Sequence, residues 1–281
     1  MSDPQVVLIT GAGSGFGLLS SIELARRGLR VFGSMRDLAR AERLDAAAEK
    51  AGVTVEKVAL DVTSEASIAA AVAEVIARAG RVDVLVNNAG FGMGGFLEDL
   101  TMAELREQFE TNFFGVAATT KAVLPAMRER RSGRIINVSS IGGRFATPGL
   151  SAYCSSKWAV EGLSESLRHE LRPYGVGVVI VEPGTFRTDI FERNRRVAKR
   201  ASDPSSPYYE RSKQLERIVD KLLEGRTADP RAVARAIARA ATVKHPRLRY
   251  LVGKDAHGQA ISKALLPFSM IETAVARYLD K

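Results

Sequence analysis

Two side chains in the middle of the chain have the types and the spacing that proton transfer needs. Tyr153 and Lys157 lie four residues apart, so a helix would place the phenol and the ammonium on one face. A free tyrosine is a poor base at pH 7 because its pKa is about 10, and a neighbouring ammonium favours the phenolate. Ser140 could hold a reacting oxygen by a hydrogen bond. The three side chains indicate chemistry in which a proton moves on or off an oxygen atom.

The spacing of this first pair is weak evidence by itself, because the chain repeats it twice. Tyr209 with Lys213 and Tyr250 with Lys254 have the same separation. Only the first pair follows an apolar run that ends in a serine pair, Ser139 and Ser140. In parallel sheets ligands bind at the carboxyl ends of the strands, where this serine pair would lie. We therefore expect the chemistry at the first pair.

A glycine-rich loop follows the first apolar run and predicts a phosphate site. Residues 10–17 read TGAGSGFG. Backbone N–H groups approach an anion closely where side chains are absent, and the positive end of the following helix favours a pyrophosphate. Phe16 stands where the G-x-G-x-x-G pattern has its third glycine, so the loop fits T-G-x-x-x-G-x-G instead. The residues expected to bind a dinucleotide here are Gly11, Ser14, Gly15, Phe16 and Gly17.

The end of the second apolar run bears on which dinucleotide is bound. In dinucleotide folds an acidic residue at this point receives the ribose hydroxyls of NAD. Here the run ends in Ser34, Met35 and Arg36. A guanidinium suits the 2′-phosphate of NADP by its charge and its forked geometry. We therefore predict NADP as the cofactor, while the adjacent Asp37 leaves NAD open and an ordinary surface role for Arg36 is the alternative.

Alternating elements must position these groups. Short runs with β-type composition alternate with helical stretches, and several runs are apolar on both faces, as strands between two helix layers must be. The runs cover residues 6–10, 31–34, 53–60, 82–87, 134–139 and 176–182. This pattern predicts an α/β fold with a single doubly wound parallel sheet, Rossmann-like, and helices on both faces.

The order of the motifs resembles that of the short-chain dehydrogenase/reductase family over about residues 6–184. Besides the glycine loop and the serine, tyrosine and lysine, the matching motifs are Asp61 with Val62, the run Asn87, Asn88, Ala89 and Gly90, then Asn112, and Pro183 with Gly184. The resemblance implies an enzyme that transfers a hydride between a nicotinamide cofactor and a carbonyl or alcohol group. An oxidised nicotinamide would add to the charge that favours a Tyr153 phenolate.

The resemblance also implies a role for individual residues. Asp61 would border the adenine together with Val62, and Asn88 would lie along the cofactor. Asn112 would order a water that leads to Lys157, and Thr188 would lie near the carboxamide. Each motif also has a purely structural interpretation as a cap, a turn or a strand end. The catalytic set would be Asn112, Ser140, Tyr153 and Lys157, and the cofactor set beyond the glycine loop would be Arg36, Asp61, Val62, Asn88, Ala89, Gly90, Tyr153, Lys157, Pro183, Gly184 and Thr188.

Two segments that differ between members of this family carry apolar side chains. They supply Phe91, Met93, Phe96 and Leu97, and then Phe186, Ile190 and Phe191. Such walls predict a bulky apolar substrate, steroid-, retinoid- or lipid-like, as in the resembling branch of 17β-hydroxysteroid and retinol dehydrogenases. Arg187 and Arg193 leave a carboxylate or a carrier-linked substrate open, and packing on the scaffold would leave a small polar carbonyl. An NADP-binding redox sensor without turnover is the alternative from another class.

The organisation of the chain predicts one domain over residues 1–281. No Pro/Gly/Ser linker, repeat or low-complexity tract divides it. Residues from about 186 to 225 are expected to form a substrate lid. Residues from about 257 to 281 are expected to form a docking or oligomer segment, and we expect a homodimer or homotetramer.

Composition narrows the function classes further. The net charge is +9, from 41 Lys and Arg against 32 Asp and Glu, but no helix-turn-helix or zinc-finger pattern predicts nucleic-acid binding. The three histidines are scattered, so no metal site is expected. The single cysteine, Cys154, fits a small packing residue and a reducing compartment, so we expect a cytoplasmic protein. No apolar stretch is long enough to span a bilayer, so no stable membrane anchor is expected and a peripheral contact stays open.

Overall fold

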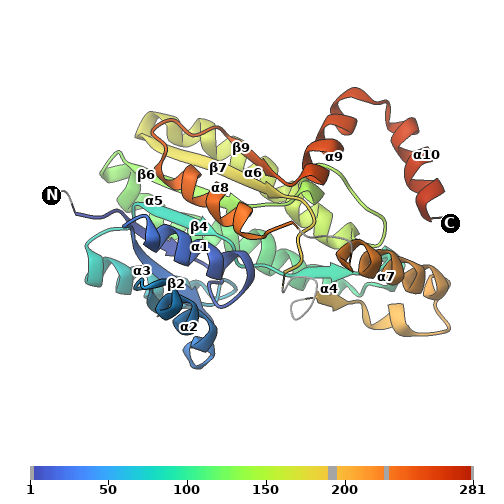
Figure 1. Ribbon diagram of the computed structural model, residues 1–281, viewed down its shortest axis with the longest axis horizontal. Coiled ribbons are helices and arrows are strands. Elements are labelled where there is room, and N and C mark those ends of the chain that lie inside the picture. Colours follow the sequence, from blue (N-terminus) through green and yellow to red (C-terminus); the bar gives the residue numbers. More distant parts are fainter. Residues whose placement is uncertain (1–2, 189–194, 225–227, 280–281) are drawn as a thin grey trace.

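The computed structural model describes residues 3–188, 195–224 and 228–279. Its central sheet has seven parallel strands in the order β3-β2-β1-β4-β6-β7-β9 (Figure 1). The strands are β1 (Val6–Ile9), β2 (Arg30–Met35), β3 (Glu56–Ala59), β4 (Val84–Asn87), β6 (Gly133–Val138), β7 (Val176–Pro183) and β9 (Arg249–Val252). The strand order reverses between β1 and β4, as in a doubly wound sheet. The predicted fold class is confirmed.

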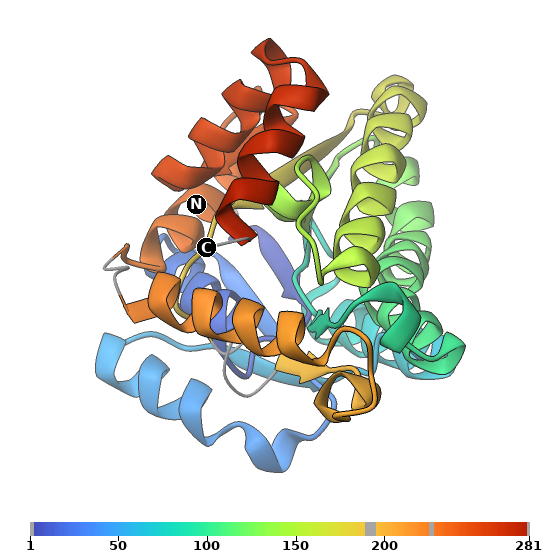
Figure 2. The same ribbon diagram turned by 90° about the vertical axis from the view of Figure 1, so that its right-hand side faces the viewer.

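Helices cover both faces of this sheet (Figures 1 and 2). Helices α1 (Gly15–Arg26), α2 (Glu42–Ala51) and α8 (Arg231–Thr242) contribute to one apolar core, and α3 (Glu65–Ala79), α5 (Gly115–Glu129) and α6 (Ser151–Leu171) contribute to the other. Successive residues of β1 alternate between the two cores: Val7 and Ile9 join the first, and Val6 and Leu8 the second. This alternation is the reason that the strands are apolar at every position.

A second group of elements lies beyond the sheet. The short strand β5 (Gly92–Gly94) pairs in parallel with β8 (Arg195–Val197), and α4 (Met102–Phe109) begins with a capping box. Helix α7 (Tyr209–Glu224) follows in the segment predicted as a lid, and α9 (Lys254–Leu265) and α10 (Phe268–Leu279) form a helical hairpin at the end of the chain. In Figure 2, α7 (orange) and α10 (red) both lie on the face of the molecule that is turned toward the viewer.

No helix among the described residues is long and apolar enough to cross a membrane. The described part of the chain also holds no group of three or more His, Cys, Asp or Glu side chains arranged to bind a metal ion.

Candidate active site

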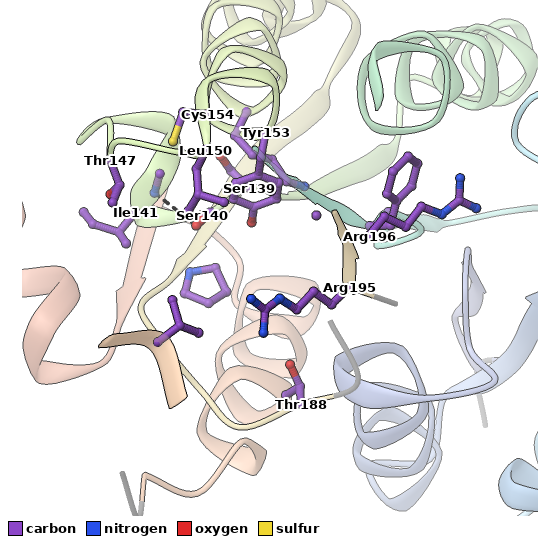
Figure 3. A pocket seen from close by; sticks show the side chains of 18 of the residues that line it. Ser139, Ser140, Ile141, Thr147, Leu150, Tyr153, Cys154, Thr188, Arg195 and Arg196 are labelled. Atoms are coloured by element: carbon purple, nitrogen blue, oxygen red, sulfur yellow. Dashed lines mark hydrogen bonds between the residues drawn. The ribbon is translucent and has the colours of Figure 1, made fainter. Parts of the chain in front are cut away.

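A large cavity opens at the carboxyl ends of the central strands. Its volume is about 1560 Å³, and its walls come from the glycine loop, the segments after β4, β6 and β7, and the elements β8, α7 and α10 (Figure 3). The cavity therefore lies where the strand order reverses, which is where ligands bind in open α/β sheets.

The glycine loop forms one wall, and its backbone is packed too closely for side chains. Gly11 and Gly15 have φ angles of +71° and +52°, which side-chain-bearing residues rarely adopt. A Cβ at Gly17 would lie 2.2 Å from the Gly11 carbonyl oxygen and 2.5 Å from Nδ2 of Asn88. Ser14 precedes the first turn of α1, so the positive end of this helix faces the cavity. The loop thus makes a backbone cradle suited to a pyrophosphate.

The run after β4 holds this loop in place. Asn88 Nδ2 donates to the carbonyl oxygens of Thr10, at 2.9 Å, and Gly11, at 3.1 Å. The Thr10 hydroxyl accepts the backbone N–H groups of Asn88 and Ala89, both at 3.0 Å. Asn88, Ala89 and Gly90 all line the cavity. The side chain of Asn88 therefore supports the cradle from behind while the run borders the cavity.

The ends of β2 and β3 form the far side of the cofactor wall. Arg36 is exposed, lines the cavity and makes no ion pair with any described residue. Asp37 is engaged locally, because its carboxylate accepts the Ala39 N–H at 3.0 Å and pairs with Arg40 at 3.6 Å. Asp61 and Val62 line the cavity too. The Asp61 carboxylate is also bonded locally, since it accepts the N–H and the hydroxyl of Thr63 at 2.9 and 2.8 Å.

Ser140 and Tyr153 face each other at the centre of the cavity (Figure 3). Ser140 lies two residues after β6, at the start of a short 3₁₀ helix. Its hydroxyl accepts the Gly142 N–H at 3.0 Å, which fixes the position of the hydroxyl. Tyr153 lies in the first turn of α6. Burial raises the pKa of Tyr153 to about 12, although a hydrogen bond with Ser140 acts in the lowering direction. The phenol is therefore protonated at neutral pH in the protein alone.

Lys157 lies beside the ring of Tyr153 and is held by the backbone of β6. Lys157 Nζ lies 5.9 Å from the centroid of the Tyr153 ring and donates to the Val138 carbonyl oxygen at 2.9 Å. Burial lowers the pKa of Lys157 to about 8, and the charge of Glu161 acts in the opposite direction. Burial therefore shifts both groups toward their uncharged forms, and an oxidised nicotinamide would add positive charge that favours the phenolate.

Asn112 lies in a π-helical turn, Glu110–Phe114, between α4 and α5. Such turns occur often at functional sites. Asn112 is fully buried, and its amide pairs with the backbone of Phe91, accepting its N–H at 3.1 Å and donating to its carbonyl at 3.0 Å. A longer bond of 3.3 Å reaches the Ser156 hydroxyl on α6. Asn112 thus ties the segment after β4 to the helix that carries Tyr153 and Lys157.

The segment after β7 completes the cofactor side. A Cβ at Gly184 would lie 2.3 Å from Oδ1 of Asp255, and Asp255 accepts the Thr185 N–H at 2.7 Å. Pro183, Gly184 and Thr188 line the cavity. The Thr188 hydroxyl is buried and has no hydrogen-bond partner among the described residues. An unsatisfied hydroxyl at this position, opposite the glycine cradle, is what a bound carboxamide group would satisfy.

Some of the expected apolar wall residues line the cavity and others do not. Phe91, Phe96 and Phe186 do. Met93 packs in a small core cluster instead, and Leu97 is 63% exposed outside the cavity. Ile190 and Phe191, like Arg193, lie outside the described residues.

Other parts of this wall could not be predicted from motifs. Arg195 and Arg196 on β8 line the cavity, and Arg195 points into it opposite Tyr153 (Figure 3). The apolar part of the same wall comes from α7 and from the hairpin of α9 and α10, as Leu215, Ile218, Val219, Leu266, Met270, Ile271, Ala274 and Val275. The apolar periodicity of residues 209–224 predicts an amphipathic helix, but it does not show that the apolar face of this helix turns toward the active site.

The family model described as short chain dehydrogenase matches residues 5–199. The chain is 41% identical to the uncharacterized oxidoreductase YusZ of Bacillus subtilis, over 98% of both chains. It is 40% identical to a 3-ketodihydrosphingosine reductase of Bacteroides thetaiotaomicron, over 97% of both. It is 37% identical to human retinol dehydrogenase 8, over 88% of this chain and 80% of that protein.

Solved structures agree with these matches. A short-chain dehydrogenase from Streptomyces avermitilis is 37% identical with a TM-score of 0.81, covering 98% of this chain and 96% of that one. A metagenomic short-chain oxidoreductase in complex with NADP is 30% identical with a TM-score of 0.69, covering 88% and 96%. One from Burkholderia phymatum in complex with NAD is 28% identical with a TM-score of 0.80, covering 97% and 95%. Both nicotinamide dinucleotides thus occur among the structural neighbours.

Proposed function

Since this chain belongs to the short-chain dehydrogenase family, we propose that it is an NADP(H)-preferring enzyme that transfers a hydride between the nicotinamide and a carbonyl or secondary alcohol group of a bulky apolar substrate. The coarser activity follows from the family: the protein is an NAD(P)-dependent oxidoreductase that acts on CH–OH or C=O groups. The finer statements about cofactor, substrate and residue roles rest on the cavity. When bound, the nicotinamide supplies or accepts the hydride.

Tyr153 is proposed to move the proton on the substrate oxygen. Its raised pKa, about 12, keeps the phenol protonated, so it can donate to a carbonyl oxygen during reduction. A reduced nicotinamide is neutral and leaves this pKa high, whereas an oxidised one is cationic and favours the phenolate that oxidation needs. Ser140 faces the same space and would hold the substrate oxygen by a hydrogen bond. The same phenol would donate a proton in reduction and, as a phenolate, accept one in oxidation.

Lys157 and Asn112 are proposed to support this pair. The Lys157 ammonium would bind the nicotinamide ribose on the cavity side while Val138 holds it from behind. Asn112 would keep the segment after β4 in register with α6 through its bonds to Phe91 and Ser156. The remaining cavity-lining residues of the cofactor wall, from the glycine loop to Thr188, are proposed to hold the dinucleotide.

The preference for NADP(H) is supported by the charges at the end of β2. Arg36 has no acidic partner among the described residues, so its guanidinium can pair with a 2′-phosphate. The carboxylate of Asp37 is already used by the Ala39 N–H and by Arg40. An NAD-type contact would compete with these two local partners for the carboxylate.

The substrate class is supported by the size and composition of the opposite wall. Aromatic and aliphatic side chains from three separate elements, such as Phe96, Leu215 and Met270, surround the space in front of Tyr153. Burying apolar ligand surface there contributes about 25 cal/mol per Å² before association costs are subtracted. Two relatives are named for acting on a ketosphingoid base and on retinol, both lipids. The cavity in front of the Ser140–Tyr153 pair is the observation that carries this proposal.

The proposal is tested by kcat/KM for a long-chain ketone and for acetoin, each with NADPH and with NADH. We expect the long ketone with NADPH to exceed every other combination by at least about tenfold, because one charge-assisted contact contributes about 1.5 to 3 kcal/mol and each buried methylene group about 0.8 kcal/mol. A tenfold advantage for acetoin would contradict the apolar substrate. Equal efficiency with NADH would contradict the cofactor preference.

A further inference from the structure

Two carboxyl groups are buried behind the proposed catalytic lysine. Glu161 follows Lys157 by one helical turn on α6 and is 5% exposed. Glu182 is the last residue before Pro183 on β7 and is fully buried. Acidic side chains are rarely buried unless they are paired, so this pair calls for a physical explanation.

Arg249 on β9 contacts both carboxyls. Its Nη2 lies 3.0 Å from Oε2 of Glu161, and its Nε lies 3.1 Å from Oε1 of Glu182. Arg144, from the segment after β6, approaches Glu182 at 3.6 Å. The half-exposed Glu165 on α6 shares the Arg249 guanidinium at 2.5 Å. Three carboxyls therefore meet two guanidinium groups, which leaves one negative charge in excess if all are ionised.

Protonation of one carboxyl removes this excess. Neither oxygen of Glu182 nor Oε1 of Glu161 accepts a hydrogen bond of regular geometry within the described part of the chain. Burial and the charge of Glu161 raise the pKa of Glu182 to about 7, although Arg144 and Arg249 act in the opposite direction. Burial also raises the pKa of Glu161. Both carboxyls depend on Arg249 for a positive partner, so the pair favours a state with one proton, held mainly by Glu182.

The pair is next to the groups that would do the chemistry. The negative charge of Glu161 raises the pKa of Lys157, which burial lowers to about 8. Glu161 also packs near Ser139, the neighbour of Ser140, since both lie against Gly143. Packing around it is tight, since a Cβ at Gly143 would lie 2.8 Å from the Ser139 hydroxyl and 3.0 Å from Cγ of Glu161. Because Glu161 lies one turn from Lys157 on the same helix and both are buried, water screens the charge of Glu161 from Lys157 only weakly.

We propose that Glu161 and Glu182 form a proton-sharing positioning pair that holds Lys157 as an ammonium and, through Arg249, ties α6 to β7 and β9. This inference rests on the proposed function, in which Lys157 binds the cofactor beside Tyr153. The pair touches no substrate atom; it acts through the lysine.

The negative charge of the Glu161–Glu182 pair depends on pH. Below the pKa of Glu182 the pair carries one negative charge, and above it the pair carries two. The second charge appears as the pH rises through about 7, just below the pKa of about 8 that Lys157 has with Glu161 beside it. Other charges facing the pair are Arg144 and Arg249, with Glu165 beyond Arg249. The lysine consequently keeps its proton to a higher pH than its burial would allow.

The test compares pH profiles of kcat/KM for Glu161→Gln, Glu182→Gln and the control Glu170→Gln. Glu170 lies on the same helix, is exposed and lies outside both the cavity and the Arg249 cluster, so its variant should keep the wild-type profile. Glu161→Gln should lose activity as the pH rises, with its alkaline limb moved about one pH unit lower, because Lys157 then loses its nearest negative charge. Glu182→Gln should remove the ionisation near pH 7. A wild-type profile in both buried variants, or an equal shift in Glu170→Gln, would overturn the proposal.

A second measurement uses the protein without substrate and stands apart from activity. Infrared spectra of the wild type should show the carbonyl band of a protonated buried carboxyl that disappears as the pH rises through about 7, and this band should be missing in Glu182→Gln. No such titration would overturn the shared proton. If Tyr153→Phe were fully active while the band titrated as expected, the proposed function would fail and the proton-sharing pair would remain.

Discussion

The two walls of the cavity are built by different means. The cofactor wall is made largely of backbone, at the ends of adjacent strands, and its close contacts leave no room for a Cβ at Gly17 or Gly184. The substrate wall is made of side chains on β8, α7 and α10, which come from separate parts of the chain. A wall built from backbone requires particular residue types at fixed spacings, whereas a wall built from side chains requires only apolar volume. Substitutions in the two walls should therefore affect different quantities: those in the cofactor wall should weaken cofactor binding, and those in the substrate wall should change substrate preference.

The largest effect is expected between the walls, at the reacting oxygen. Tyr153→Phe removes only the hydroxyl, so turnover should fall by about 10²- to 10⁴-fold, the usual contribution of a positioned acid or base. NADPH affinity and thermal stability should stay close to those of the wild type. Tyr209→Phe is the matched control, because Tyr209 has the same spacing to a lysine but lies outside the cavity. Steady-state kinetics decide, and comparable rates for the two variants would refute the assignment.

The next largest effect is expected in the cofactor wall. Gly17→Ala would place a Cβ 2.2 Å from the Gly11 carbonyl oxygen, so the loop must shift, at a cost of about 1 to 3 kcal/mol. The Kd for NADPH, measured by fluorescence titration, should rise about thirtyfold. At a fixed, subsaturating NADPH concentration, kcat/KM should fall by the same factor for every substrate. Gly162→Ala is the control, since a Cβ there meets nothing within 4 Å. An unchanged Kd for Gly17→Ala would mean that the loop does not hold the dinucleotide.

The same difference explains what the sequence could predict. The strands and the glycine cradle were predictable because burial on two faces and close backbone approach each restrict the residue types that fit. Leu215 and Arg195 were not, since nothing in their local sequence shows that α7 and β8 return to the strand ends. Met93 and Leu97 show the converse error: they have suitable side chains, but Met93 turns into a core cluster and Leu97 into solvent. The pKa of Tyr153 was also out of reach, because desolvation depends on the finished packing.

A smaller effect is expected at the edge of the cofactor wall, where a side chain and not the backbone is expected to bind the cofactor. Arg36→Ala should raise the KM for NADP(H) about tenfold and leave that for NAD(H) nearly unchanged, since a single charge-assisted contact contributes about 1.5 to 3 kcal/mol. Arg26→Ala, at the last turn of α1 and outside the cavity, is the control. Equal increases for both cofactors would show that Arg36 supports the fold of the loop and does not read the 2′-phosphate.

The smallest effect is expected in the substrate wall, and it should depend on the substrate. Leu215 is half-buried and lines the cavity from α7, so Leu215→Ala removes apolar surface that a long ligand would cover. At about 0.8 kcal/mol per buried methylene, kcat/KM for a long-chain ketone should fall about three- to tenfold. The value for acetoin should not change, because a small carbonyl next to Tyr153 would not reach α7, and the KM for NADPH should not change either. Arg217→Ala, on the exposed side of the same helix, controls for altered helix stability. This outcome would separate the two walls, since Gly17→Ala weakens every substrate alike. Equal losses for long and short substrates in Leu215→Ala would show instead that α7 supports the cofactor wall, and the division between the two walls would then be wrong.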